Sequence, residues 1–257
     1  MPDLRQNYQA WNELYRWEQQ GEEWSHAWGG SEAQWYFAIY PRIHSFLPAG
    51  HLLEIAPGYG RWTQYLRNYC TRLSLVDLSE KCIEVCRQRF QDVPLIECHV
   101  NDGLSLGMIH DDSCDFIFTF DSLVHAEIEV LESYVREISS KLTSQGIAFI
   151  HHSNLSSVPE LARTAPGAAS HWRAPSVSSE LVRKAAEANG LICLSQEAIN
   201  WGTKECIDCI TVLARPCSKY ERPCIFLENP NFMTEAEAIK RCSQVYTFQP
   251  GTRSLNE

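Results

Sequence analysis

The chain has 257 residues, of which 44% are hydrophobic, and its formal net charge at pH 7 is −10. This length fits one large α/β domain with additions. The acidic balance argues against a nucleic-acid partner, because proteins that bind phosphate backbones neutralise them with clustered Lys and Arg. No apolar run is long enough to span a membrane, and we find neither a signal-peptide core nor a basic amphipathic face. We therefore expect a cytoplasmic protein without membrane insertion.

The N-terminal fifty residues are rich in tryptophan, with Trp11, Trp17, Trp24, Trp28 and Trp35. We predict a helical cap over residues 1–49, a core over 50–215 and a C-terminal extension over 216–257. The extension contains one predicted helix, 234–242, whose Thr234 and Glu237 have the spacing of a capping box.

Short apolar runs alternate with segments of helical spacing through the core. The predicted strands are 51–56, 73–77, 95–100, 114–120, 147–151, 191–195 and 205–213, and the predicted helices are 61–69, 79–90, about 127–142 and 179–189. A turn is expected at Ser144-Gln-Gly146. The alternation predicts a Rossmann-like, seven-stranded, mostly parallel sheet with helices on both faces. The proline-rich loop of about 154–178 is long enough to be a lid.

A glycine turn follows the first predicted strand, in Glu54-Ile-Ala-Pro-Gly58-Tyr-Gly60-Arg-Trp-Thr63. Glycines there let the backbone approach a ligand at the edge of the sheet. Thr63 stands where dinucleotide enzymes carry a third glycine, and the Glu54 carboxylate would repel a pyrophosphate but attract a cationic amino-acid group. Asp77 ends the second strand and can accept ribose hydroxyls, and Asn101-Asp102-Gly103 ends the third, where a side chain can bind adenine.

These three motifs, in this order, resemble class I S-adenosylmethionine-dependent methyltransferases over roughly residues 50–215. The resemblance implies S-adenosyl-L-methionine as cofactor and the following contacts: Glu54, Ala56, Gly58, Tyr59, Gly60, Arg61, Thr63, Asp77, Leu78, Asn101, Asp102, Gly103 and Phe120. In the alternative interpretation, each acidic residue only caps a helix or lies in a solvated turn.

The fourth predicted strand ends near His125, which faces the expected position of the methyl donor. A hydroxyl acceptor must lose its proton, and a histidine suits that role, so His125 is the candidate general base. It could instead hydrogen-bond the lid or cap the next helix. His151 and His152 end the fifth strand and point to opposite faces, so at most one of them faces the pocket. Asp121 with one of these histidines makes only a weak metal site, and we expect no metal.

The eleven cysteines are mostly single, and neither Cys82 with Cys86 nor Cys206 with Cys209 makes a four-ligand site. In a strand, the offset between Cys206 and Cys209 sends their side chains to opposite faces. We predict free, mostly buried thiols.

The series Trp24-Ser-His-Ala-Trp28-Gly-Gly-Ser, Pro41-Arg-Ile, Asp121-Ser-Leu-Val-His125 and His151-His-Ser-Asn154 is similar to methyltransferases of glycan and polysaccharide modification. The similarity implies an oxygen acceptor on a sugar or other small molecule. Candidate substrate contacts are Trp24, Trp28, Arg42 and Asn154, although Trp24, Trp28 and Trp35 also have the spacing of a core-facing helical stripe. Arg42 and Arg61 could hold a carboxylate or simply be solvated.

Three functions remain open at this stage. They are an O-methyltransferase for a small or glycan acceptor, an N-methyltransferase for an amine or peptide side chain, and a cofactor-binding protein without catalysis. The sequence does not identify the acceptor or the oligomeric state.

Overall fold

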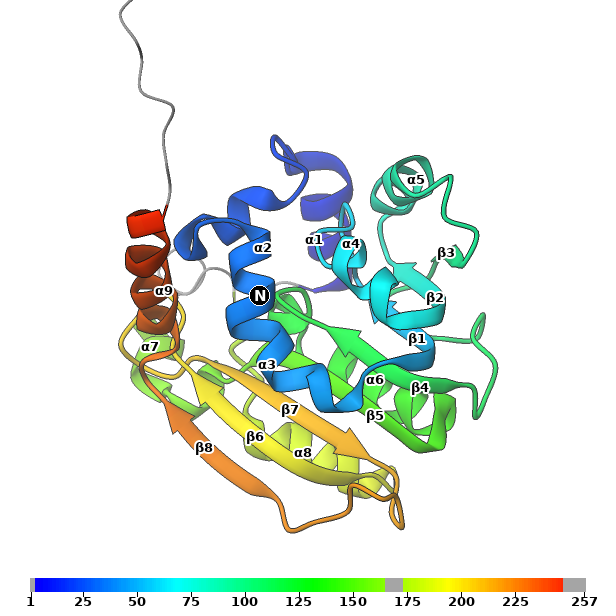
Figure 1. Cartoon of the computed structure of the whole chain (residues 1–257). Helices are drawn as coiled ribbons and strands as arrows, with labels where there is room; N and C mark the ends of the chain where they lie inside the picture. Colours follow the sequence, from blue (N-terminus) through cyan, green and yellow to red (C-terminus); the bar gives the residue numbers. More distant parts are fainter. Residues whose placement is uncertain (1–2, 165–172, 247–257) are drawn as a thin grey trace, which may run out of the picture.

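A central β-sheet organises the fold. The computed structural model describes residues 3–164 and 173–246, which contain one eight-stranded sheet of order β3-β2-β1-β4-β5-β7-β6-β8 (Figure 1). Its strands are β1 (Ala49–Ile55), β2 (Cys70–Asp77), β3 (Ile96–Val100), β4 (Cys114–Thr119), β5 (Leu142–Ser153), β6 (Ile192–Ile199), β7 (Asp208–Ala214) and β8 (Ile225–Asn229).

The prediction of a mostly parallel Rossmann-like sheet is confirmed, but the predicted number of strands is wrong. Only β7 runs antiparallel to its neighbours, β5 and β6. The eighth strand, β8, lies in the C-terminal extension and pairs parallel with β6. The first four residues of β8 are all exposed. It therefore lacks the alternation of buried and exposed positions by which a strand is recognised.

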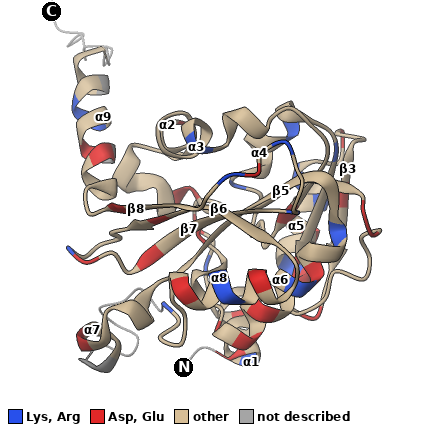
Figure 2. Ribbon diagram, turned by 90° about the horizontal axis from the view of Figure 1, so that it is seen from below, with Lys and Arg blue, Asp and Glu red and all other residues tan. Residues whose placement is uncertain are grey.

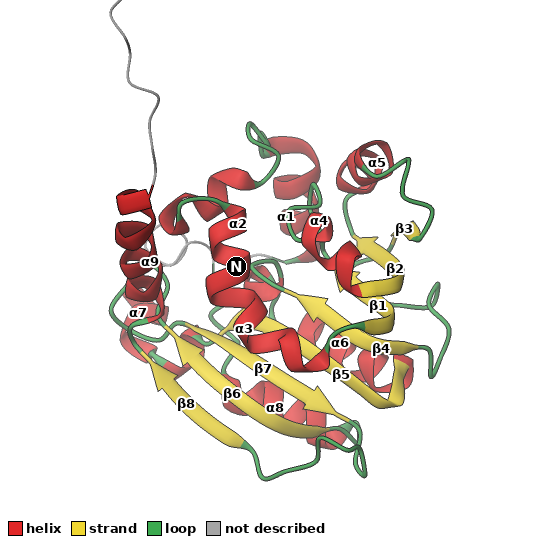
Figure 3. Ribbon diagram, in the orientation of Figure 1, coloured by secondary structure: helices red, strands yellow, loops and turns green. Residues whose placement is uncertain are grey.

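Helices cover both faces of the sheet (Figures 2 and 3). On one face lie α2 (Ser31–Gln34), α3 (Tyr40–Ile43), α4 (Thr63–Leu66) and α5 (Glu80–Arg89), and on the other lie α6 (Ile128–Lys141) and α8 (Ser179–Ala188). The hydroxyls of Ser79 and Ser178 cap α5 and α8 by accepting backbone N–H groups, as serine at this position typically does. Within the described ranges, no helix is long and apolar enough to cross a membrane.

The N-terminal segment is a succession of short helical turns, as predicted for the cap. It consists of α1 (Leu4–Tyr8), a π-helical turn (Gln9–Leu14), a 3₁₀ turn (Glu22–Trp28), α2, a second π-helical turn (Trp35–Ile39), α3 and a 3₁₀ turn (His44–Phe46). Trp24, Trp28 and Trp35 do not form one stripe, because left-handed glycines at Gly29 and Gly30 separate Trp35 from the other two. Trp28 and Trp35 are buried in the core.

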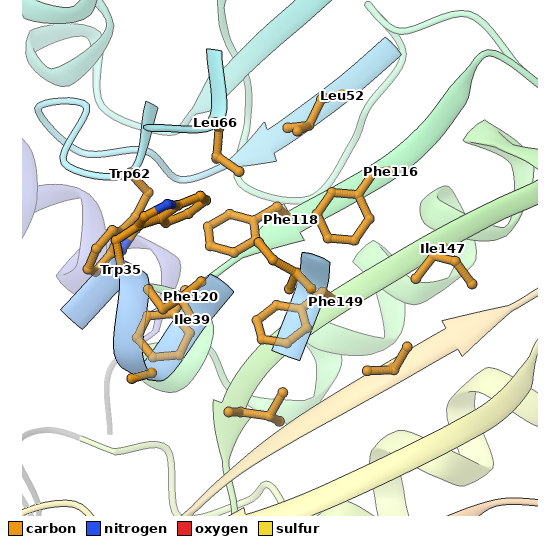
Figure 4. Packing of buried hydrophobic residues seen from close by; sticks show 14 of the residues in the cluster. Trp35, Ile39, Leu52, Trp62, Leu66, Phe116, Phe118, Phe120, Ile147 and Phe149 are labelled. Carbon is orange, nitrogen blue, oxygen red and sulfur yellow. The ribbon is translucent and has the colours of Figure 1, made fainter. Parts of the chain in front are cut away.

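An aromatic core joins this cap to the sheet (Figure 4). Trp35 and Trp62 pack over β4, and the rings of Phe118 and Phe149 stack with their centroids 5.6 Å apart. Aromatic side chains bury large areas and dominate such cores. The cap is therefore an integral part of the domain.

The C-terminal helix α9 (Phe232–Tyr246) begins two residues before the predicted N-cap Thr234, so that capping prediction is wrong. The hydroxyl of Thr234 instead donates to the Asn231 carbonyl. Phe232 is 1% exposed and packs against Trp28 and Trp201, which anchors the extension to the core.

Three further segments of the chain correct or complete the prediction. The turn predicted at Ser144–Gly146 lies within β5, and Cys206 precedes β7, so it does not share a strand with Cys209. The loop of 154–178 contains a 3₁₀ turn (Leu155–Ser157) and α7 (Pro159–Thr164), and its residues 165–172 lie outside the described part of the chain.

Candidate active site

A pocket opens at the carboxyl ends of β1, β2 and β4. β1 pairs with both β2 and β4, so the chain connections diverge there, and such switch points are where open α/β sheets bind ligands. Many predicted residues line this pocket: Trp24, Ala56, Gly58, Arg61, Asp77, Leu78, Gly103, Phe120, Asp121 and His125. The cap closes it with residues that the sequence analysis did not assign to the site, including Leu4, Asn7, Tyr8, Trp11 and Trp17.

The glycine turn is held in an unusual backbone conformation. Ala56 has φ of 56° and Gly58 has φ of 58°, and an alanine is rarely found there without functional reason. A Cβ on Gly58 would lie 2.8 Å from the ring of Trp17, which itself stacks on Tyr59. Gly60 is equally constrained, since its Cβ would lie 2.5 Å from Phe90. A side chain at either glycine would therefore collide with the aromatic rings that pack against the turn.

Asp77 ends β2 and lines the pocket with a carboxylate that is 7% exposed. Its two oxygens accept the backbone N–H groups of Gly58 (3.1 Å) and Ser79 (2.8 Å). Burial raises the pKa of this carboxyl to about 6, and the N–H bonds limit the rise. The carboxylate is fixed in place and remains able to accept hydroxyl groups of a ribose.

Glu54 lies beneath the glycine turn, outside the lining of the pocket. Its Oε2 accepts the hydroxyl of Thr63 at 2.6 Å, whereas no partner is found for Oε1 in the described structure. Burial raises the pKa of Glu54 to about 8; the Thr63 bond lowers it, and the charge of Asp77 raises it further. Burying a carboxyl oxygen without a hydrogen-bond partner costs free energy, and a cationic ligand group nearby would lower that cost.

The third motif forms a tight loop after β3. Asn101 donates to the Ser105 carbonyl and the Tyr134 hydroxyl, and its Oδ1 accepts the N–H of Gly103. Asp102 accepts the N–H groups of the two residues that follow Gly103, and these bonds lower its pKa. Only Gly103 of this motif lines the pocket, where its Cβ would meet Leu4 of the cap at 2.7 Å.

Asp121 follows β4 with a positive φ of 59° and is 5% exposed at its side chain. Arg61 binds its carboxylate at 2.8 Å, so Arg61 is neither solvated nor available as a free cation. The backbone N–H of Asp121 donates to Nδ1 of His151, which places the ring proton on Nε2, facing Asp208 at 3.2 Å.

Arg173 closes a ring of charges around Asp121, a role that nothing in its sequence context signalled. It donates twice to Asp208, with a shortest distance of 2.6 Å, and lies 3.8 Å from Asp121. Burial alone would raise the pKa of Asp208, but Arg173 and His151 outweigh it and hold the pKa well below its usual range. Asp121 and His151 therefore belong to a charge-balanced network. Among the described residues, no cluster of three or more His, Cys, Asp or Glu could hold a metal ion.

His125 lies at the end of the pocket beneath the cap. It closes a short 3₁₀ turn (Leu123–His125), is 8% exposed, and its ring packs 5.1 Å from that of Trp11. The Asn7 side chain donates to its backbone carbonyl at 3.0 Å. Trp11 also contacts Trp17 and Trp24, and these three rings form a tryptophan wall that meets the His125 ring through Trp11.

Other predicted residues also lie outside the lining of the pocket: Tyr59, Gly60, Thr63, His151, His152, Asn154, Trp28 and Arg42. His152 is fully buried and bonded to Thr211, and burial lowers its pKa to about 4. Asn154 bonds the backbone before β7, at Cys206, and Trp28 lies in the core. Arg42 binds Glu197 through two nitrogens, each at 2.7 Å, as well as Glu235, which joins α3 to β6 and α9.

A family model described as a methyltransferase domain matches residues 53–150, the part of the chain that carries all three motifs. These residues are therefore similar to methyltransferase domains, in agreement with the predicted S-adenosylmethionine-dependent methyltransferase.

Individual proteins are also similar to this chain in sequence or in fold. Ribosomal RNA small subunit methyltransferase A of Geobacter metallireducens is 36% identical over 61 residues, which are 24% of this chain and only 22% of that protein. The fold resembles N-methyltransferase NodS of Bradyrhizobium japonicum in complex with S-adenosyl-L-homocysteine, with a TM-score of 0.58 at 16% identity over 82% of this chain and 98% of that one. The PH0226 protein of Pyrococcus horikoshii has a TM-score of 0.57 at 16% identity over 81% and 96%. At these identities, the two structures support the fold alone.

Proposed function

We propose that this chain transfers a methyl group from S-adenosylmethionine to a hydroxyl oxygen of a small acceptor, such as a sugar or glycan unit, with His125 as general base. The observation that supports this proposal most is one pocket lined both by Asp77 and the glycine turn and by His125 with its tryptophan wall. The cofactor supplies an electrophilic methyl group on a sulfonium.

The residues around the glycine turn fit the cofactor. Asp77 would accept ribose hydroxyls, and Leu78 and Gly103 line the same pocket, where adenine would lie. An ammonium group of the cofactor that reaches the unsatisfied Oε1 of Glu54 would lower the free-energy cost of burying this carboxyl. Phe120, a predicted cofactor contact, and Asp121 line the same pocket.

The acceptor side of the pocket is enclosed and aromatic. The rings of Trp11, Trp17 and Trp24 present flat apolar faces, on which the carbon face of a sugar ring can pack. His125 would accept the proton of the attacking hydroxyl, and the cap would exclude water from that step.

The same rings also favour an alternative, N-methylation of an amine. Aromatic faces attract ammonium groups, and Trp11, Trp17 and Trp24 line a pocket that also contains the Asp121 carboxylate. NodS, one of the similar structures, is an N-methyltransferase. A nucleic-acid acceptor is disfavoured by the net charge of −10, and the ribbon in Figure 2 shows acidic and basic residues interspersed.

Calorimetric titration with S-adenosylhomocysteine tests the cofactor site. We expect the Asp77→Asn variant to bind about 10- to 100-fold more weakly than wild type, the usual effect of losing hydrogen bonds to a charged group. Replacement of the exposed Asp92 by Asn is the matched control and should change nothing. Absence of binding by the wild-type protein contradicts the whole proposal.

The role of His125 is tested with methyl-labelled cofactor and a panel of sugars, sugar phosphates and amines. The His125→Gln variant should bind S-adenosylhomocysteine as wild type does and lose about 10²- to 10⁴-fold in transfer to hydroxyl acceptors. Full activity of this variant, with label found only on amines, favours the N-methyltransferase and rejects His125 as base.

A further inference from the structure

Two thiols meet at the edge of the sheet, far along the strand order from the cofactor pocket. Cys193 lies in β6, and Cys224 immediately precedes β8, which pairs with β6 from Ile225 onward. Their sulfur atoms are 3.2 Å apart, closer than two unbonded sulfurs normally approach. Figure 3 shows β6 and β8 side by side at this edge.

The two cysteines differ in their access to solvent. Cys224 is exposed, whereas Cys193 is 7% exposed, and both are free thiols. Burial and the neighbouring Cys224 raise the pKa of Cys193. Because the thiolate is the nucleophile, Cys224 is the thiol that reacts first with a reagent in solution.

We propose that Cys193 and Cys224 are a dithiol site that a small-molecule disulfide such as oxidised glutathione converts into an intramolecular disulfide. The bond would fasten β8 and the C-terminal extension to β6.

The exchange proceeds in two balanced steps. The Cys224 thiolate attacks one sulfur of oxidised glutathione, which forms a mixed disulfide and releases one glutathione thiolate. Cys193 then loses its proton and attacks the Cys224 sulfur, which releases the second glutathione. The two cysteines together lose two electrons and two protons, and one oxidised glutathione becomes two reduced molecules.

The position of the bond gives it a structural effect. β8 is paired only with β6 in the sheet order, and its residues Ile225 to Leu227 are more than half exposed. A few residues beyond it, Phe232 packs against Trp28 and Trp201. Closing the 31-residue separation between the two cysteines restricts the unfolded chain and should raise the melting temperature by about 5–10 °C.

Non-reducing peptide mapping after incubation of the full chain with oxidised glutathione tests the proposal. Tryptic cleavage places Cys193 alone in peptide 185–204 and Cys224 alone in peptide 220–240, because the bond between Arg222 and Pro223 resists trypsin. We expect these two peptides to be linked and the melting temperature to rise. Cys217 and Cys242 are exposed controls in other peptides, and each should carry single glutathiones.

The serine variants separate the two roles. In Cys193→Ser, Cys224 should stay as a mixed disulfide with no gain in melting temperature, and in Cys224→Ser, Cys193 should remain unmodified. Binding of S-adenosylhomocysteine should be equal in the reduced and oxidised wild-type protein, which keeps this test independent of the proposed function. Glutathione retained on Cys224 of the wild type, or a link between Cys224 and any other cysteine, overturns the proposal.

Discussion

The buried carboxyl of Glu54 makes stability depend on pH in a way that one substitution should remove. Glu54 is 1% exposed, and its pKa is raised from 4.5 to about 8. Between these values, the folded chain keeps a proton that the unfolded chain releases. Its contribution to stability is therefore fully present below pH 4.5 and is lost as the pH rises through 8.

The magnitude follows from the two pKa values. Between pH 6 and pH 9, the wild type should lose roughly 3 kcal/mol of unfolding free energy that a Glu54→Gln variant keeps, at ~1.4 kcal/mol per pKa unit. Glutamine can still accept the Thr63 hydroxyl. If the amide destabilises the variant, its unfolding free energy falls by the same amount at every pH. The slope of unfolding free energy against pH is then unaffected, so the difference in slope between the two proteins reports the Glu54 proton alone.

Urea unfolding of both proteins at pH 6, 7, 8 and 9, followed by tryptophan fluorescence, measures this difference. The exposed Glu84→Gln is the control and should follow the wild type. Parallel curves for wild type and Glu54→Gln would show that Glu54 is ionised in the folded protein, and the argument from its burial would fail.

Two further substitutions test the pocket and the C-terminal anchor. Gly58→Ala adds a methyl group 2.8 Å from Trp17, at a position with a left-handed backbone. Calorimetry should therefore show at least tenfold weaker binding of S-adenosylhomocysteine. The control is Gly107→Ala, which has open space around it and should bind as the wild type does. Phe232→Ala should lower the free energy of unfolding by about 3–5 kcal/mol in urea, because this side chain is fully buried. Phe226 is 57% exposed, so Phe226→Ala should lower it by under about 1 kcal/mol. Equal effects would contradict the role of Phe232 as an anchor.

The sheet was predictable because its signals are local. Alternating apolar runs and helical spacings identified β1 to β5 and the helices between them. β8 was missed because both of its faces are exposed, and the turn at Ser144–Gly146 was wrong because these residues extend the start of β5. Neither feature leaves a periodic pattern in the sequence.

The site was only partly predictable for a different reason. Asp77 and Gly58 stand in a motif, and their place in the pocket follows from strand order. Trp11 and Trp17 lie far from the motifs in the sequence but line the same pocket. Arg173 is likewise distant in sequence from Asp208 and Asp121, which it contacts in the fold. Such contacts depend on tertiary packing, which neither spacing nor composition reports.

The division of the pocket between two segments has a consequence for how its specificity can change. The predicted cofactor contacts lie in residues 53–150, whereas the tryptophan wall comes from the first 24 residues. On the proposed function, exchanging that first segment for one with different side chains would alter which acceptor is admitted. Because Trp17 packs on Gly58 and Leu4 packs on Gly103, the replacement has to keep these two contacts for the cofactor side to stay unchanged. Acceptor selectivity can thus change through the first segment only within the limits that these contacts set.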